Sequence, residues 1–324
     1  MEKVNLTSGF VLLGFSDLHY NHAALFSTIL VIYTLTWTAN FLLLTSIKLS
    51  PHLHTPMYFF LGNLPVVDVY FSTVTVPKLL FCILHGRTSI SFLGCFLQMY
   101  FFVFLGVTEI FLLSAMAFDR YLAICNPLRY TSLMNDKFMV ILSISCWIAA
   151  ALRSLLHTYN VSKLTYCEDR LIPHFFCDAT LLIKLSCSNT ALVQLLIYTE
   201  GSIIVIIQFL FILVSYVSPM FVFLLIGWAI MKTKTSSNRS KAFSSCSSHL
   251  MVICLFYGTI TFIYFHPPSN YSSQKYLQSS QYDRIVSMAY TIITPMLNPF
   301  IYSLRNQDVK NSLKKLIIQC FSHY

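Results

Sequence analysis

The stretch MAFDRYLAICNPLRY, residues 116–130, places an acid–base pair, Asp119 and Arg120, at the end of a long apolar run. From residue 97 to 118 the only charged side chain is Glu109, so the run is long enough and apolar enough to cross a bilayer as a helix. Adjacent helix residues point about 100° apart, so Asp119 can brace Arg120 sideways and leave it open to another partner. The simpler interpretation is an interfacial anchor, with Arg120 reaching to lipid headgroups.

The composition agrees with a membrane protein. Of 324 residues, 56% are hydrophobic and only 10% are charged, and the mean hydropathy is +0.68. A soluble domain of this size does not need so much apolar surface. The net charge of +9 comes from short basic clusters between apolar runs, which attraction to the inner leaflet explains better than nucleic acid does. We therefore expect membrane lipids as a partner and no nucleic acid.

Seven apolar stretches have the length of a membrane span. They predict an all-α membrane protein, a seven-transmembrane helix bundle with an extracellular N-terminus (1–23), a transmembrane domain (24–304) and a cytoplasmic tail (305–324). Basic residues concentrate on the side shared by the C-terminus, which places the N-terminus outside. In the tail, Leu313, Leu316 and Ile317 recur at helical spacing and predict a short amphipathic helix on the inner leaflet. The expected spans are 24–48, 57–81, 96–121, 138–157, 195–231, 243–265 and 285–304.

The outer side carries two kinds of covalent signal. Asn5 heads an N-glycosylation sequon, Asn-Leu-Thr. Four cysteines also fall on this side, which indicates disulfides in an oxidising compartment, although spacing alone leaves three connectivities open. These are Cys95, Cys167, Cys177 and Cys187.

Three acidic residues lie inside predicted spans and should face the bundle interior: Asp68, Glu109 and Glu200. Asp68 and Glu109, with Asn298 at comparable depth, would suit a small hard cation such as sodium. A hydrogen-bonded polar core without an ion is an equal alternative. No other cofactor is expected. Glu200 in an apolar cavity would favour ligands that donate a hydrogen bond or carry positive charge.

Four passages together carry a family resemblance: LHTPMYFFL (53–61), MAFDRYLAICNPLRY (116–130), SKAFSSCSSHL (240–250) and PMLNPFIYSLRN (295–306). Over nearly its whole length the chain resembles the odorant receptors among the rhodopsin-like (class A) G-protein-coupled receptors. The resemblance implies a plasma-membrane receptor, not an enzyme. Such a receptor binds small-molecule odorants and activates a heterotrimeric stimulatory olfactory G protein, which raises cyclic AMP.

The resemblance also implies roles for individual residues. It pairs Cys95 with Cys177 and Cys167 with Cys187, and it gives Asp68 and Glu109 the sodium site. Coupling and activation would use Asp119, Arg120, Tyr121, Tyr216, Asn298, Pro299 and Tyr302. The ligand would lie in the outer half of the bundle, against Phe102, Val103, Gly106, Val107, Glu200, Gly201, Ile204, Tyr257, Thr261, Tyr264, Met288 and Thr291.

Other functions remain open at this point. A non-odorant class A receptor for a metabolite has the same fold. An ion-coupled transporter would also have intramembrane acids and broken helices, but the seven spans show no inverted symmetry. Two departures from the family pattern bear on coupling: Pro65 stands where the family has Ser, and the run from Tyr216 to Lys241 is about two helical turns longer than usual.

Overall fold

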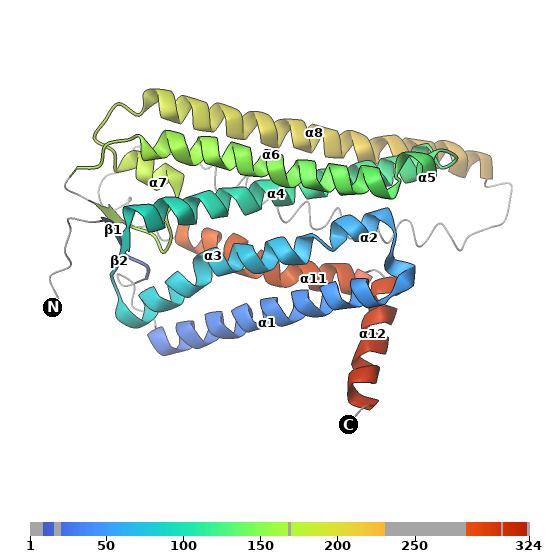
Figure 1. The fold of residues 1–324 in the computed structure, drawn as a ribbon, viewed down its shortest axis with the longest axis horizontal. Coiled ribbons are helices and arrows are strands. Elements are labelled where there is room, and N and C mark those ends of the chain that lie inside the picture. Colours follow the sequence, from blue (N-terminus) through green and yellow to red (C-terminus); the bar gives the residue numbers. More distant parts are fainter. Residues whose placement is uncertain (1–8, 16–20, 168–169, 231–282, 306, 323–324) are drawn as a thin grey trace.

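The chain is mostly helical, and the computed structural model describes residues 9–15, 21–167, 170–230, 283–305 and 307–322 (Figure 1). Within these ranges six segments are long and apolar enough to cross a membrane. Apolar runs adopt helices in a bilayer because a helix satisfies its backbone hydrogen bonds internally. The six are α1 (His22–Leu49), α2 with α3 (Pro56–Leu61 and Leu64–His85), α4 (Phe92–Cys125), α6 (Asp136–Ser162), α8 (Ala191–Ile230) and Asp283–Ser303, which contains most of α11 (Thr294–Arg305).

Side-chain caps set where two of the central helices begin. The Ser91 hydroxyl accepts a hydrogen bond from the Gly94 amide at the start of α4. The side-chain oxygen Oδ1 of Asn135 accepts a hydrogen bond from the Phe138 amide at the start of α6. Each cap satisfies an N–H group that the first helical turn leaves without an intrahelical partner. The polar residues between the apolar runs therefore fix the helix boundaries.

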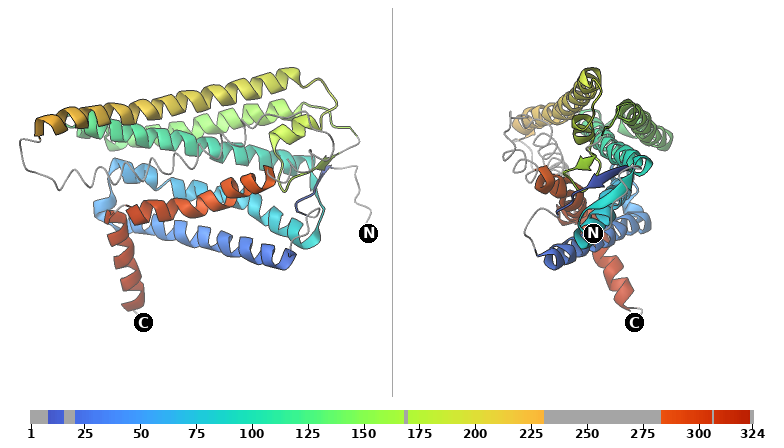
Figure 2. Two further views of the ribbon diagram at one scale, coloured as in Figure 1. Left: turned by 180° about the vertical axis from the view of Figure 1, so that it is seen from behind. Right: turned by 90° about the vertical axis from the view of Figure 1, so that its left-hand side faces the viewer.

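The long helices lie side by side in one bundle, with α4 at its centre (Figures 1 and 2). One side of α4 packs against α3, and the other packs against α6 and α8. Leu112, Leu113 and Ala117 in the middle of α4 are completely buried. Helices α1 and α11 complete the α3 side. Both sides of α4 are thus available to hold polar groups away from the surface.

A small sheet closes one end of the bundle, which we call the sheet end. Strand β1 (Gly9–Leu12) lies in its middle, antiparallel to β2 (Thr88–Ser91) and parallel to β3 (Leu171–Ile172). Phe10 and Leu12 are fully buried beneath it. Helix α7 (Ala179–Lys184) follows β3 at the same end (Figure 1). Residues before the first helix therefore cover the bundle.

The opposite end, which we call the Arg120 end, holds short connections. These are η1 (Pro51–Leu53) and α5 (Tyr130–Leu133), and from here α12 (Gln307–Ser322) leaves the bundle at an angle (Figures 1 and 2). Ser312 of α12 lies 3.0 Å from the His52 imidazole, between Ser312 Oγ and His52 Nε2. The tail residues 307–322 are helical as predicted.

Two spans depart from a regular helix near a proline. Residues 62–63 separate α2 from α3, and Pro65 occupies the first turn of α3, where a missing N–H is tolerated. In the last span, the π-helical turn η2 (Ala289–Ile293) directly precedes Pro295. Insertions of this kind widen a helix and free backbone groups for other partners.

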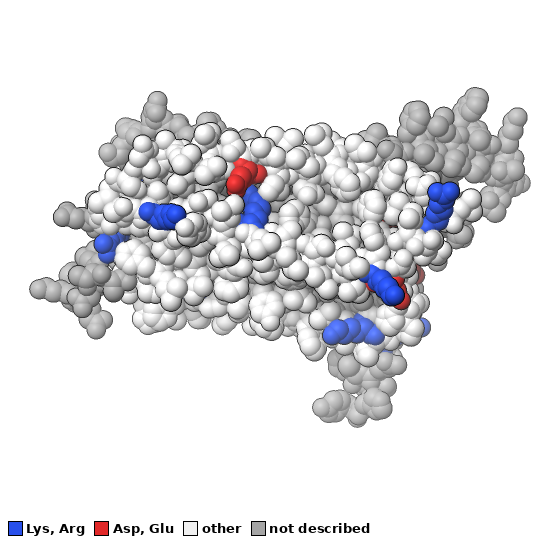
Figure 3. Space-filling model, turned by 45° about the horizontal axis from the view of Figure 1, so that its top comes forward, with Lys and Arg blue, Asp and Glu red and all other residues white. Residues whose placement is uncertain are grey.

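The surface fits a membrane environment. Large apolar side chains such as Phe41, Leu93 and Leu152 are more than 60% exposed. On the face shown in Figure 3 charged side chains are few, and most of them lie toward the two ends. The wide belt between the ends is uncharged except for one pair of an acidic and a basic side chain. An exposed apolar belt of this kind is stable in lipid and unfavourable in water.

The structure corrects some predicted boundaries. The fourth span reaches residue 162 instead of 157. The second span is broken where a continuous helix was expected. The span predicted over 243–265 lies outside the described residues, as do Asn5 and the part of the long run after Tyr216 that follows residue 230.

Candidate functional site

A buried acidic cluster lies on the α3 side of α4. The Asn298 amide donates hydrogen bonds to Asp68 Oδ1 at 2.9 Å and to Glu109 Oε1 at 3.4 Å. Asp68 is 2% exposed and Glu109 is 4% exposed. One amide thus holds two carboxyl groups together in the low-dielectric interior, where two like charges repel strongly. Among the described atoms, the Asn298 oxygen in this cluster has no hydrogen-bond partner.

Beside this cluster, the proline break in α11 is stabilised from α1. Pro299 lacks the N–H that would bond to the carbonyl of Pro295, four residues earlier. Asn40 donates a hydrogen bond to that carbonyl, from Nδ2 to Pro295 O at 3.1 Å. A neighbouring helix therefore supplies the donor that the proline removed, as a break inside a membrane requires.

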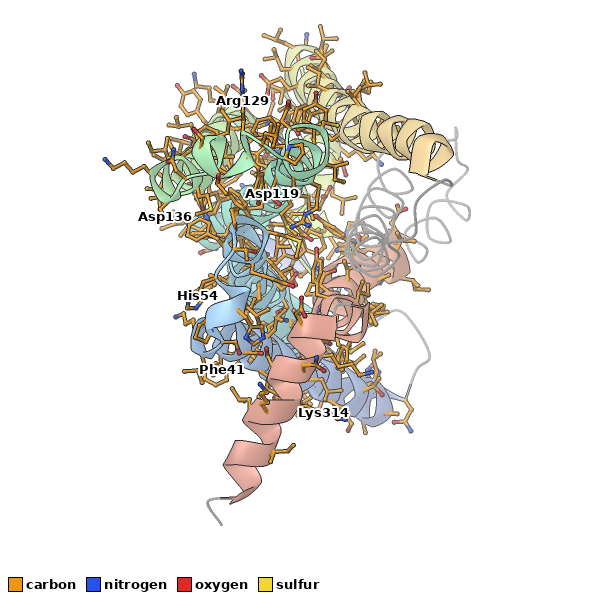
Figure 4. All side chains as sticks on the ribbon, turned by 90° about the vertical axis from the view of Figure 1, so that its right-hand side faces the viewer. Phe41, His54, Asp119, Arg129, Asp136 and Lys314 are labelled. Atoms are coloured by element: carbon orange, nitrogen blue, oxygen red, sulfur yellow. A yellow bond between two sulfur atoms is a disulfide. The ribbon has the colours of Figure 1, made fainter. Side chains whose placement is uncertain are left out.

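At the Arg120 end, Asp119 and Arg120 form an ion pair of 3.1 Å between Arg120 Nη2 and Asp119 Oδ2. Tyr130 donates its hydroxyl to the other carboxylate oxygen at 2.7 Å. Asp119 is fully buried, whereas Arg120 remains 18% exposed. Figure 4 shows Asp119 among the helices, with Arg129 and Asp136 at the periphery of the same end. The geometry is the sideways brace that the sequence predicts.

Four tyrosines bear on the role given to this pair. Burial, and then the hydrogen bond to Asp119, raise the pKa of Tyr130 above its usual value, so its hydroxyl stays protonated and donating. Tyr302 is buried and Tyr121 is half-buried. The side chain of Tyr216 lies outside the described part of the chain.

A cavity of about 330 Å³ lies on the opposite side of α4, toward the sheet end. This volume is at the small end of the range for ligand pockets. The walls are mostly apolar, with hydroxyl groups and two basic side chains. Lining residues come from α4, α6, α7, α8 and η2: Phe102, Val103, Gly106, Val107, Ile110, Arg153, His157, Thr180, Ile197, Tyr198, Gly201, Ser202, Ile204, Val205 and Tyr290.

Two glycines make room for this cavity. An added Cβ on Gly106 would lie 3.1 Å from the Tyr290 hydroxyl, closer than most real contacts. An added Cβ on Gly201 would meet nothing within 4 Å and would point into open space. Both positions were predicted as ligand contacts.

The predicted ligand contacts fall into three groups. Phe102, Val103, Gly106, Val107, Gly201 and Ile204 line the cavity. Glu200, Met288 and Thr291 do not line this cavity, and their contact with a ligand stays a prediction. Glu200 precedes Gly201 on α8 and so points about 100° away from it, and the Thr291 hydroxyl bonds to the Ser287 carbonyl instead. Tyr257, Thr261 and Tyr264 lie outside the described residues.

The basic residues of the cavity were missed by the sequence analysis. Arg153 and His157 are four residues apart, so they share one face of α6. Both residues lie inside the predicted span 138–157, but a predicted span does not show which helix each of its faces packs against. Their i, i+4 spacing within an apolar run was the signal that could have identified them.

Above the cavity, two disulfides secure the sheet end. Cys95 is joined to Cys177, and Cys167 to Cys187, which are the two pairs that the resemblance implies. The first ties the start of α4 to the segment before α7. The two cysteines of the second pair stand 20 residues apart and close a shorter loop.

Next to the disulfides, Arg284 joins the last span to the N-terminal segment. It is fully buried, donates a hydrogen bond of 2.6 Å from Nη1 to the Gly14 carbonyl and lies over the Phe15 ring. His174 is also buried here, against Phe175 and Phe176. Burial, and then the charge of Arg284, lower the pKa of His174 to about 3, so the imidazole is neutral.

Comparison with known proteins gives one consistent result. A family model described as olfactory receptor matches residues 29–320. Olfactory receptor 1G1 of Gorilla gorilla gorilla is 45% identical over 98% of this chain and 97% of its own length. Olfactory receptor 1f45 of Rattus norvegicus is 43% identical over 96% and 95%, and olfactory receptor 1J4 of Homo sapiens is 43% identical over 97% and 96%.

These matches span all six described membrane helices and extend across the region of the seventh predicted span, 243–265. The family is one of multi-pass membrane receptors with a seven-helix bundle, and its members are receptors and not enzymes. The match is far above the level at which a shared fold alone would account for it. The chain therefore belongs to the olfactory receptor family, within the class A G-protein-coupled receptors.

Proposed function

We propose that this receptor binds small volatile molecules in the cavity beside α4 and activates a heterotrimeric stimulatory olfactory G protein, which raises cyclic AMP. In this arrangement the sheet end faces outside and the Arg120 end faces the cytoplasm, at the plasma membrane. The basic residues near the C-terminus support this orientation, and α12 would lie on the inner leaflet. Asn5 would then carry a glycan.

The observation that carries the proposal is the position of α4. About two and a half turns of one helix separate Ile110, the last cavity residue on α4, from Asp119 of the ion pair. At 1.5 Å per residue the separation is about 14 Å. A ligand that shifts or rotates α4 therefore also moves the ion pair, because a packed helix responds as a rigid element.

The lining indicates the kind of ligand. Mostly apolar walls with hydroxyl groups suit a small molecule with one polar group. Removing one buried methylene changes binding by only about 0.8 kcal/mol, so discrimination by shape alone is coarse. A broad preference for molecules of one length and polarity is the expected behaviour.

We also propose a sodium ion at the acidic cluster. Asp68, Glu109 and the Asn298 oxygen form a set of oxygen donors that fits a hard cation. Among the described residues no group of three or more His, Cys, Asp and Glu side chains could hold a metal, so water would complete the coordination. The ion would supply the positive charge that two neighbouring carboxylates need in order to stay ionised.

The test of the main proposal is cyclic AMP in cells that express the receptor with a trafficking chaperone, screened against a broad odorant panel. Arg120→Ala should abolish the agonist response while surface expression is retained. Arg129→Ala is the matched control, because Arg129 is exposed at the same end and makes no part of the ion pair. Normal signalling by surface-expressed Arg120→Ala would contradict the role given to this pair.

A further inference from the structure

The cavity has one polar corner that the apolar walls do not explain. Arg153 and His157 both line it from α6, one helical turn apart. Arg153 stands nine residues before the end of α6 at Ser162, which places it about 13 Å below that end. An arginine within a membrane helix is costly unless polar groups or water meet its charge, which the apolar walls of the cavity do not supply.

His157 gives the more direct indication of a ligand. Its side chain is only 8% exposed, yet within the described part of the chain its Nε2 atom has no hydrogen-bond partner. A buried ring nitrogen without a partner is unfavourable unless something else fills the site. Because His157 borders a cavity, a bound molecule can supply that partner.

The chemistry of the corner selects an acceptor. Arginine is always protonated and has only donor groups, and a neutral histidine donates from Nε2 when that atom carries the proton. Hydrogen bonds from a guanidinium to an oxygen acceptor are among the strongest in proteins. The Tyr198 hydroxyl lines the same cavity and can add a further contact. Glu200, which was expected to favour ligands that donate a hydrogen bond, does not line this cavity.

Resting on the function proposed above, we propose that this receptor selects small apolar molecules that end in an oxygen acceptor, a carboxylate or a carbonyl. Arg153 and His157 hold that oxygen, and the hydrocarbon part lies along Val103, Gly106 and Ile204. The opposite selection, for amines, is the outcome expected if Glu200 controlled the site.

The experiment uses the full-length receptor and four compounds on one straight-chain skeleton of about eight carbons: the acid, the aldehyde, the amine and the hydrocarbon. Binding is measured as thermal stabilisation of purified receptor, and activation as cyclic AMP in cells. The acid and the aldehyde should act at concentrations at least tenfold lower than the amine and the hydrocarbon.

Single substitutions test which side chains cause the preference for the acid and the aldehyde. Arg153→Gln should weaken the acid by tenfold or more and the aldehyde less. His157→Phe should weaken both, and His157→Gln, which keeps a donor, should restore part of the loss. Lys163→Gln is the matched control, because it removes a positive charge from the exposed end of the same helix. It should leave the ranking unchanged.

Two results would overturn the inference: an amine or hydrocarbon that binds as well as the acid and aldehyde, or an acceptor preference that survives in both Arg153→Gln and His157→Phe. Binding and signalling separate this inference from the proposed function. Acceptor-selective binding without cyclic AMP would support the ligand class and contradict the coupling. A rise in cyclic AMP driven by amines would support the coupling and contradict the ligand class.

Discussion

The two sides of α4 both contain buried polar groups, but they treat them differently. On the α3 side, Asp68 and Glu109 are held by the Asn298 amide. On the α6 and α8 side, Arg153 and His157 border a cavity of about 330 Å³. The first arrangement resembles a protein core, in which one amide serves two buried carboxyl groups. Among the described residues, the second leaves His157 Nε2 without a hydrogen-bond partner in the wall of a cavity that a ligand can occupy.

The polar groups on the two sides of α4 are therefore expected to have different roles. Groups that are satisfied internally should matter mainly for stability, because removing one leaves buried partners without hydrogen bonds. Groups that face the cavity should matter mainly for ligand response. Substitutions on the two sides can test this division separately.

The largest effect is expected at Asn298. Asn298→Ala leaves two carboxyl groups buried without their shared donor, which should cost about 3 kcal/mol. Thermal unfolding of purified receptor should show a midpoint lower by roughly 5–10 °C. Leu297→Ala serves as a control on the same helix, since Leu297 is only partly buried. An unchanged midpoint for Asn298→Ala would remove the structural role given to the acidic cluster.

The next effect is a dependence of folding stability on pH, which comes from a buried side chain at the sheet end and not from the cavity. His174 has a pKa of about 3 in the folded receptor, against about 6.5 in an unfolded chain. Above pH 6.5 both states are neutral and stability does not change. Below it, the unfolded chain takes up a proton that the folded chain does not, so stability falls by about 1.4 kcal/mol per pH unit, or roughly 2 kcal/mol at pH 5.

Measuring the unfolding midpoint between pH 7 and pH 5 checks this. His174→Gln should flatten the slope over that range. His22→Gln is the control, since His22 is exposed at the start of α1, and it should keep the slope. The same slope in wild type and His174→Gln would show that another group is responsible.

A smaller effect is expected from filling the cavity. Gly201→Val adds an isopropyl group where the structure has open space, so folding should be unaffected. Agonist potency in the cyclic AMP assay should fall by about tenfold, equivalent to about 1.4 kcal/mol, because the ligand loses that volume. Unchanged potency with normal surface expression would place the ligand elsewhere.

The smallest effect is expected at Ser202, another lining residue. Ser202→Ala removes one hydroxyl from the cavity wall and should change stability by less than about 0.5 kcal/mol. Potency should move only for ligands with a second polar group. A loss of stability like that of Asn298→Ala would mean that the cavity wall is packed as tightly as the acidic side, and the contrast would fail.

The helical architecture was predictable because it depends on long runs of apolar residues. Five of the described spans begin and end within a few residues of the prediction, and the Asp119–Arg120 brace follows from adjacency on one helix. The break before Pro65 was harder to place. It depends on how α2 and α3 pack, which the local sequence does not specify.

The cavity was only half predictable, for a geometric reason. Phe102, Gly106 and their neighbours follow from the spacing along one helix. Which residues of α6 and α8 face them depends on helix rotation and on how far each helix extends. The sequence places Arg153 and His157 four residues apart on one helix face, but it does not show that this face borders the cavity.

The order of strands in the sheet has a consequence for biosynthesis. Val11 pairs with Leu171, which is made 160 residues later. At 5–20 residues per second, β1 waits about 8–30 s for this partner after it is synthesised. The bond from Arg284 to Gly14 spans 270 residues and must wait longer still. The sheet end therefore stays incomplete until residue 284 is made, although its first strand is among the first parts of the receptor to be synthesised.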